Sequence, residues 1–154
     1  MNILIIEDSV VEATLLTKTL QKVIEEPVEV RHADTLAKGV ETLKDRKTKV
    51  DLIFLDLGLP DSPDWHHTYE AVSPYTEHLP VIVMTSNKSP EIIEELMQHG
   101  FQDYIVKGGR KHEAEALKET IFFARLRHKM VDKLAKTVKE KDQTVNWLSG
   151  GYSA

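Results

Sequence analysis

The fold is decided by the stretch Leu52-Ile53-Phe54-Leu55-Asp56, in which four apolar residues are followed by a single acid. A short apolar run without polar alternation is typical of a strand that is covered on both faces of a parallel sheet. Similar runs occur at residues 3–6 and 81–84. We therefore predict a buried parallel sheet built around these three strands.

Segments with a helical spacing of apolar residues lie between these strands, and two further strands are expected at residues 28–30 and 104–106. Apolar positions three and four residues apart predict helices within 11–23, 36–43 and 92–97. Strand and helix alternate five times along the chain. This pattern favours an α/β fold with a doubly wound, five-stranded parallel sheet.

The connection over residues 61–79 has the weakest helical pattern. Pro63, Pro74 and the tripeptide Trp65-His66-His67 interrupt its apolar spacing. We predict a long loop and a short helix in this connection. A surface loop is favoured over a transition-metal site, because adjacent histidines point apart on most backbones. The role of the tripeptide stays open at this point.

The C-terminal part of the chain is predicted to form one long helix, because residues 111–148 contain neither glycine nor proline. We expect a domain at residues 1–125, an extension of its last helix at 126–148 and a flexible tail at 149–154. The extension either pairs with a second copy as a coiled coil or frays unpaired, since its second apolar seam is incomplete. Its first seam recurs every seven residues at Leu117, Ala124, Val131, Val138 and Val145.

Composition limits the class of protein. The chain has 154 residues, enough for one domain with an appendage, and no cysteine, which excludes disulfides and thiolate metal sites. No signal peptide or run of about 18 apolar residues is present. We therefore expect a cytoplasmic protein that does not contact a membrane.

The net charge of −5 is unevenly distributed along the chain. Residues 1–106 are acidic, with 9 Lys and Arg against 19 Asp and Glu, whereas residues 107–141 hold 11 against 5. A basic helix can attract nucleic acid or an acidic protein surface, although a solvated helix face is the simpler interpretation. We expect no nucleic-acid partner, because the residues after the last strand are too few for a DNA-binding domain.

Reactive side chains follow the ends of four predicted strands: Glu7 and Asp8 after the first, Asp56 at the third, Thr85 at the fourth and Lys107 after the fifth. In a doubly wound sheet these ends meet at one edge, where function is concentrated. Clustered carboxylates need a cation, and hard oxygen ligands suit Mg²⁺. Asp56 is therefore a candidate nucleophile toward phosphorus, with the lysine and the metal neutralising charge.

The ordered set of motifs resembles that of response-regulator receiver domains over residues 2–125. The resemblance implies a flavodoxin-like fold with strand order 2-1-3-4-5 and a cytoplasmic signalling switch rather than a dedicated enzyme. The matching segments are Ile5-Ile6-Glu7-Asp8, Phe54-Leu55-Asp56-Leu57-Gly58-Leu59-Pro60, Met84-Thr85-Ser86 and Asp103-Tyr104-Ile105-Val106-Lys107-Gly108.

The same resemblance implies roles for the residues of the phosphoryl chemistry. Asp56 would be phosphorylated by a histidine kinase or a phosphotransfer protein, and Thr85 and Lys107 would hold the phosphoryl oxygens. Tyr104 matches the aromatic switch position of the family. The phosphorylated form would then signal through altered contacts with a downstream protein.

The resemblance also implies a ligand set for Mg²⁺, consisting of Asp8, Asp56 and the carbonyl of Gly58, with Glu7 supporting the ion through water. The chain departs from the family pattern after Pro60, where a glycine is common and Asp61 stands here. This departure leaves the conformation of the following loop undecided.

Two alternatives to a stand-alone regulator remain. The chain could be the excised receiver of a larger sensor kinase or cyclase, for which its sequence offers no test. An aspartate-nucleophile phosphatase of the haloacid dehalogenase type is disfavoured, because such enzymes carry Asp-x-Asp after the first strand, where this chain has Glu7-Asp8.

Overall fold

A five-stranded parallel sheet lies at the centre of the computed structural model, which describes residues 1–86, 89–108 and 114–149, with side chains up to residue 142. The strand order is β2-β1-β3-β4-β5, which confirms the predicted fold. The second strand lies further along the chain than the predicted 28–30. The strands are β1 (Asn2–Ile6), β2 (Glu29–Ala33), β3 (Leu52–Asp56), β4 (Val81–Thr85) and β5 (Asp103–Val106).

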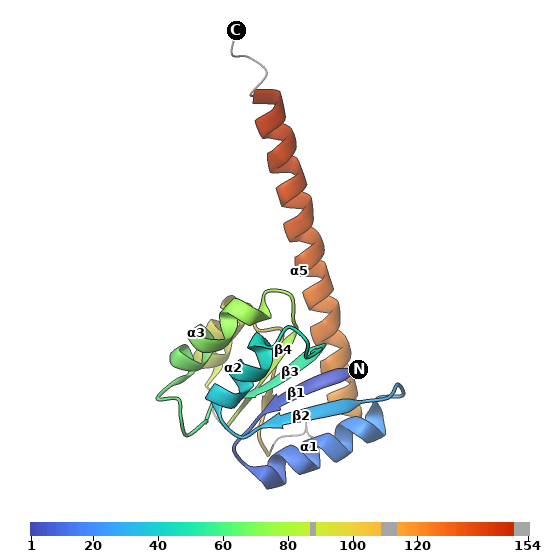
Figure 1. Ribbon diagram of the computed structural model, residues 1–154, viewed down its shortest axis with the longest axis vertical. Coiled ribbons are helices and arrows are strands. Elements are labelled where there is room, and N and C mark those ends of the chain that lie inside the picture. The colour runs from blue at the N-terminus through green and yellow to red at the C-terminus, as the bar shows by residue number, and fades with distance from the viewer. Residues whose placement is uncertain (87–88, 109–113, 150–154) are drawn as a thin grey trace.

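Helices cover both faces of the sheet (Figure 1). One face carries α2 (Leu36–Lys44), α3 (Trp65–Thr76) and α4 (Pro90–Gln98), and the other carries α1 (Val10–Val23) and α5 (Ala114–Ser149). The two faces have separate hydrophobic clusters, so each layer of helices encloses its own half of the core.

Strand β1 shows why its apolar run is continuous. Ile3 and Ile5 belong to the cluster beneath α1 and α5, whereas Leu4 and Ile6 belong to the cluster beneath α2, α3 and α4. Successive side chains of a strand point to opposite faces, and both faces of this strand are buried. A run with no polar position is the expected consequence.

The prediction of a long loop and a short helix over 61–79 is wrong, because α3 spans 12 residues. The carboxylate of Asp64 caps the helix by accepting a hydrogen bond of 2.9 Å from the backbone N–H of His67. Thr68 and Val72 are buried one turn apart, so the helix has an inward face that Pro74 does not interrupt. Pro74 cannot donate to the carbonyl of residue 70, and the Ser73 hydroxyl donates to that carbonyl instead.

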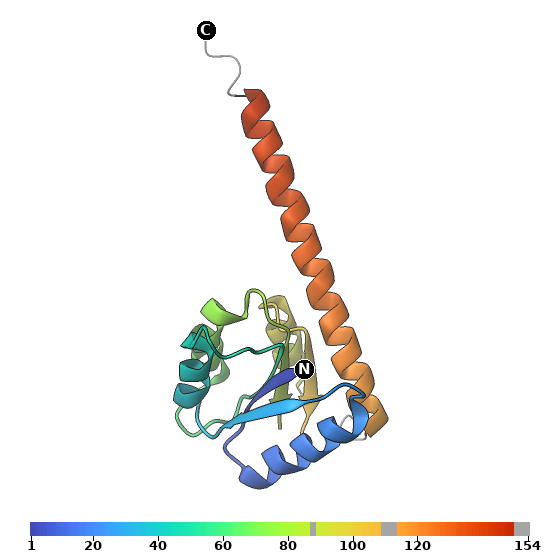
Figure 2. The same ribbon diagram turned by 45° about the vertical axis from the view of Figure 1, so that its right-hand side comes forward.

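Helix α5 continues well past the sheet as a single helix (Figure 2). Its first turns pack on the sheet through Leu117, Ile121 and Ala124. Further along, the exposed apolar side chains include Val131, Leu134 and Val138, while residues 150–154 of the predicted tail lie outside the described residues. Within the described part of the chain, none of the helices is long and apolar enough to cross a membrane.

Candidate functional site

The carboxyl ends of β1 and β3 bring three acids together. Glu7, Asp8 and Asp56 each offer a carboxylate oxygen, and these oxygens lie within 4.8 Å of one another. Glu7 and Asp56 are buried, whereas Asp8 is exposed. The parallel pairing of β1 with β3 explains the cluster, because it aligns the ends of the two strands.

Lys107 connects this acidic cluster to the end of β5. Its Nζ lies 2.7 Å from Oε2 of Glu7 and 3.0 Å from Oδ2 of Asp56. The backbone N–H of Lys107 also donates to the carbonyl of Thr85 at 2.9 Å. The structure therefore brings together the acids, the lysine and the β4 end that the sequence placed at one edge of the sheet.

Glu12 is a member of this cluster that sequence reasoning missed. Its Oε2 lies 2.8 Å from Nζ of Lys107, although it projects from the first turn of α1 rather than from a strand end. Ser9 caps α1 by accepting a hydrogen bond from the backbone N–H of Glu12, and this contact fixes the position of the Glu12 backbone. The sequence could place Glu12 near the acidic cluster only if the first residue of α1 were already known.

A pocket of about 420 Å³ opens above Asp56. The backbone N–H of Gly58 donates to Oδ1 of Asp56 at 3.0 Å, so one carboxylate oxygen is oriented by backbone and the other by Lys107. Trp65 and Ile92 contribute apolar surface to the lining of this pocket. The lining residues are Asp8, Asp56, Leu57, Gly58, Asp64, Trp65, Thr85, Ser86, Ile92 and Lys107.

Burial and hydrogen bonding to the oppositely charged partner act in opposite directions on the pKa values of Glu7 and Lys107. Burial raises the pKa of Glu7, the nearby charge of Asp56 raises it further, and the hydrogen bond from Lys107 only partly opposes this. Burial alone would lower the pKa of Lys107, but hydrogen bonds to Glu12, Glu7 and Asp56 outweigh it and raise that pKa far above its usual value. Lys107 thus stays charged throughout the physiological range.

The donor set fits a divalent cation. The ammonium of Lys107 contacts the carboxylates of Glu7, Glu12 and Asp56. The carboxylate of Asp8 lies within 4.8 Å of those of Glu7 and Asp56, so the cluster is strongly negative when its acids are ionised. Oxygen ligands of this kind suit Mg²⁺.

Tyr104 lies on β5, half-buried against the cluster beneath α3 and α4. It pairs with Val83 in the sheet, and Thr85 pairs with Val106 two positions along. Tyr104 and Thr85 therefore stand on the same face of neighbouring strands, as diagonal neighbours.

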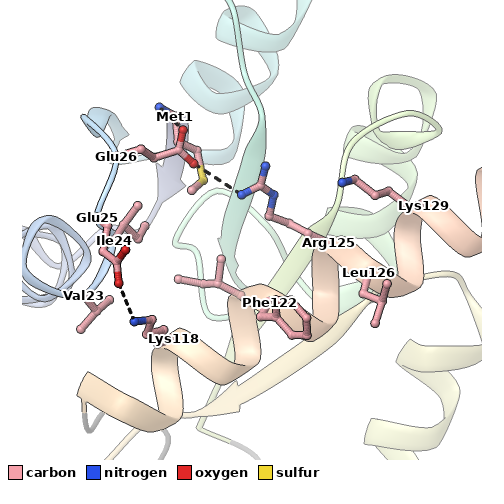
Figure 3. Close-up of a pocket in the computed structure, with 11 residues that line it drawn as sticks. Met1, Val23, Ile24, Glu25, Glu26, Lys118, Phe122, Arg125, Leu126 and Lys129 are labelled. Carbon is pink, nitrogen blue, oxygen red and sulfur yellow. Dashed lines mark hydrogen bonds and ion pairs between the residues drawn. The ribbon is translucent and has the colours of Figure 1, made fainter.

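A second hollow, of about 490 Å³, lies between α5 and the connection from α1 to β2 (Figure 3). Its floor is apolar, and two ion pairs cross it: Lys118 with Glu25 at 3.1 Å, and Arg125 with Glu26 at 3.5 Å. These contacts anchor the first turns of α5 to the domain. Both acids of this hollow are thus paired with basic side chains of α5.

The fold and the site define a class of signalling domain, a doubly wound sheet with an acidic cluster and a lysine at its carboxyl edge. The sequence profile described as "Response regulator receiver domain" matches residues 3–122. The chain belongs to this family, the receiver domains of response regulators in two-component systems, which confirms the resemblance seen in the sequence.

Among known proteins, the regulatory protein LuxO of Vibrio cholerae is 30% identical over 123 residues, which are 80% of this chain and 25% of LuxO. The chain thus spans about a quarter of that relative. The two-component response regulator ORR8 of Oryza sativa subsp. indica is 28% identical over 107 residues, 69% of this chain and 85% of ORR8.

Solved structures agree with the fold. The signal receiver domain of a LuxO repressor protein from Vibrio parahaemolyticus has a TM-score of 0.69 and 26% identity, covering 86% of this chain and 95% of that one. The N-terminal domain of a response regulator/sensory box/GGDEF three-domain protein from Carboxydothermus hydrogenoformans has a TM-score of 0.68 and 25% identity, covering 84% and 98%.

Proposed function

We propose that this chain is a phosphorylation-dependent switch of a two-component or phosphorelay pathway, with Asp56 as the phosphoacceptor. The observation that carries the proposal is the position of Asp56. Asp56 is the last residue of a buried strand, and it lines a pocket. Its carboxylate lies 3.0 Å from the ammonium of Lys107. Such a carboxylate is oriented for attack on an incoming phosphorus atom.

In the reaction, a carboxylate oxygen of Asp56 forms a bond to phosphorus while the bond from phosphorus to the donor breaks. The donor, a phosphohistidine of a kinase or phosphotransfer protein or a small acyl phosphate, leaves with the electron pair. Lys107 and the hydroxyl of Thr85 hold phosphoryl oxygens as negative charge shifts onto them. Gly58 keeps the other oxygen of Asp56 in place through its backbone N–H.

Mg²⁺ would be held by Asp8, Asp56 and the Gly58 carbonyl, with Glu7 supporting it through water. When bound, the ion neutralises charge on the phosphoryl group and the acids. The protein contributes a buried carboxylate and an exposed one side by side, so Asp8 stays open to solvent for ion entry while Glu7 stays fixed.

Intact mass spectrometry after incubation with acetyl phosphate and Mg²⁺ tests this function. We expect the wild-type chain to gain one phosphoryl group, and we expect no gain without Mg²⁺ or in Asp56→Asn. Asp51→Asn is the matched control, because Asp51 stands just before the same strand at its opposite end. Phosphorylation of Asp56→Asn at the wild-type level, or none in a folded wild-type chain, would contradict the proposal.

We propose that Tyr104 transmits the phosphorylated state to the protein surface, and its position diagonal to Thr85 in the sheet supports this role. Phosphorylation would draw Thr85 toward the phosphoryl group and let the Tyr104 ring turn inward, which changes the surface of α4, β5 and α5. Hydrogen exchange can test this. Tyr104→Ala should still be phosphorylated but should lose the phosphorylation-dependent change in protection of α4. An unchanged response would remove Tyr104 from the switch.

A true phosphatase is the competing enzymatic function. It predicts catalytic release of phosphate from many small phosphate esters, whereas a receiver modifies itself and loses the group slowly to water. A turnover assay on such esters therefore separates the two functions.

Another alternative is that this chain is the receiver of a larger protein. It is supported by the similar Carboxydothermus domain, which is the N-terminal domain of a three-domain protein.

We further propose that the part of α5 beyond the sheet pairs with the same helix of a second copy. The proposal is supported by the exposed Val131 and Val138, seven residues apart, with Leu134 between them. Apolar residues at this spacing form the seam of a coiled coil, and exposed apolar stripes mark interaction surfaces.

A further inference from the structure

Lys107 shares its charge among three carboxylates, not two. Its Nζ lies 2.7 Å from Glu7, 2.8 Å from Glu12 and 3.0 Å from Asp56. A lysine ammonium has three donors, so three partners at these distances use its full capacity. A phosphoryl group on Asp56 would therefore meet a lysine that is already engaged.

Glu12 differs from the other two partners in its surroundings. The Glu7 side chain is 1% exposed and the Asp56 side chain 4% exposed, whereas the side chain of Glu12 is 50% exposed. Its carboxylate reaches the site from α1, which follows the strand end rather than forming it. Of the three partners of Lys107, Glu12 is therefore the one whose side chain is least buried in the domain.

Distance makes Glu12 relevant to the phosphorylated state. The oxygens of Glu12 and Asp56 contact the same nitrogen, at 2.8 and 3.0 Å, so they lie within about 6 Å of each other. A phosphoryl group on Asp56 adds negative charge beside the Glu12 carboxylate. Like charges at this separation repel, and the repulsion is only partly screened by water and salt.

We propose that Glu12 is a positioning residue that holds Lys107 in the unphosphorylated state and disfavours a phosphoryl group on Asp56. Glu12 sets how much of the protein is phosphorylated at a given donor concentration, and it takes no part in bond making. The inference rests on the proposed function, since it requires Asp56 to be the phosphoacceptor.

Binding of beryllofluoride, an anionic mimic of a phosphoryl group, tests the inference without a chemical step. Trp65 lines the pocket, so its fluorescence can report occupancy in a Trp147→Phe background that leaves it as the single tryptophan. With Mg²⁺ saturating for every variant, we expect Glu12→Gln to lower the apparent Kd for beryllofluoride roughly three- to fivefold. Intact mass with acetyl phosphate should show a matching rise in phosphorylated fraction.

Two comparisons separate a local effect from a general one. Glu25→Gln removes the same charge from a carboxylate that pairs with Lys118 at 3.1 Å, away from the pocket, and should leave the Kd unchanged. Glu12→Asp keeps the charge on a shorter side chain, and its apparent Kd for beryllofluoride should lie between those of wild type and Glu12→Gln. The difference between wild type and Glu12→Gln should shrink toward none in about 1 M salt, where the Debye length is about 3 Å.

The outcomes are distinguishable. An equal or weaker affinity in Glu12→Gln, with a wild-type chain that binds beryllofluoride and is phosphorylated on Asp56, overturns the inference and leaves the proposed function standing. A wild-type chain that neither binds the anion nor is phosphorylated overturns both. A salt-independent gain would show that Glu12 acts through structure rather than through charge, which also contradicts the proposal.

Discussion

Nζ of Lys107 lies 2.7 Å from Oε2 of Glu7, a carboxylate whose side chain is 1% exposed. The pairing does not return the Glu7 pKa to its usual value, because burial and the charge of Asp56 both raise it. The buried carboxylate therefore costs stability whenever it is ionised without a further cation. This cost is consistent with a site that is completed by a bound metal ion.

The first prediction concerns pH and Glu7→Gln in the absence of Mg²⁺. Because the folded-state pKa of Glu7 is raised above 4.5, the folded chain binds more protons than the unfolded chain between the two pKa values. The free energy of unfolding of the wild type should fall as pH rises through this window, and the Glu7→Gln substitution removes that loss. Urea unfolding at several pH values should show the variant gaining stability relative to wild type as pH increases.

Addition of Mg²⁺ is the control for this experiment. The ion should stabilise the wild type more than the Glu7→Gln variant above the raised pKa, because binding to the folded state alone increases stability. A stability difference that does not change with pH would contradict the assigned cause of the pKa shift.

The second prediction concerns Gly39 in α2, which packs closely on β1. A Cβ at this position would collide with Cδ1 of Ile6, a fully buried side chain, and would lie 2.8 Å from its Cγ1. Alanine favours a helix over glycine by about 1 kcal/mol, but overpacking a core costs about 1–3 kcal/mol. We expect Gly39→Ala to destabilise the protein in urea unfolding by roughly 1 kcal/mol net.

A double-mutant cycle with Ile6→Val tests the cause. Removal of the Cδ1 atom should relieve the closest contact and leave the one to Cγ1, so the two changes together should cost less than the sum of the separate costs. Additive costs would mean that the loss in Gly39→Ala has another origin.

The sheet and most of the site could be predicted from the sequence for one physical reason. Each buried strand is an unbroken apolar run, and each run ends at a reactive residue such as Asp56 or Thr85. Parallel strands put these ends at one edge, so sequence order alone brings the residues together. The proximity of Glu7, Asp8 and Lys107 to Asp56 follows from the same rule.

The features that escaped prediction depend on contacts between elements that are distant in sequence or weakly patterned. Glu12 reaches Lys107 from a helix face, and no strand end marks it. The loop after Pro60 could not be assigned, yet the carboxylate of Asp61 accepts hydrogen bonds from the N–H groups of Leu36 and Ala37, each at 2.9 Å. Asp61 thus caps α2 from a position 24 or 25 residues away in the chain.

The third prediction follows from this cap. Asp61→Ala leaves two backbone N–H groups at the start of α2 without their carboxylate partner, and loss of a helix cap costs about 1 kcal/mol. Asp61→Asn keeps one acceptor oxygen and should lose less. Urea unfolding should rank the stabilities as wild type, then Asn, then Ala. Equal stability of wild type and Asp61→Ala would show that water replaces the cap without cost.

The fourth prediction concerns the exposed stripe of α5. If two copies pair through this helix, a charge placed in its seam should separate them, because burying an unpaired charge is strongly unfavourable. Light scattering after size exclusion should give twice the monomer mass for the wild-type chain at high micromolar concentration. The Val131→Glu and Val138→Glu variants should give the monomer mass. Lys136→Glu is the control, since position 136 lies roughly on the opposite side of the helix from both valines and should leave the mass unchanged. The proposed pairing is wrong if the wild-type chain remains a monomer at every concentration, because the exposed stripe would then not hold two copies together.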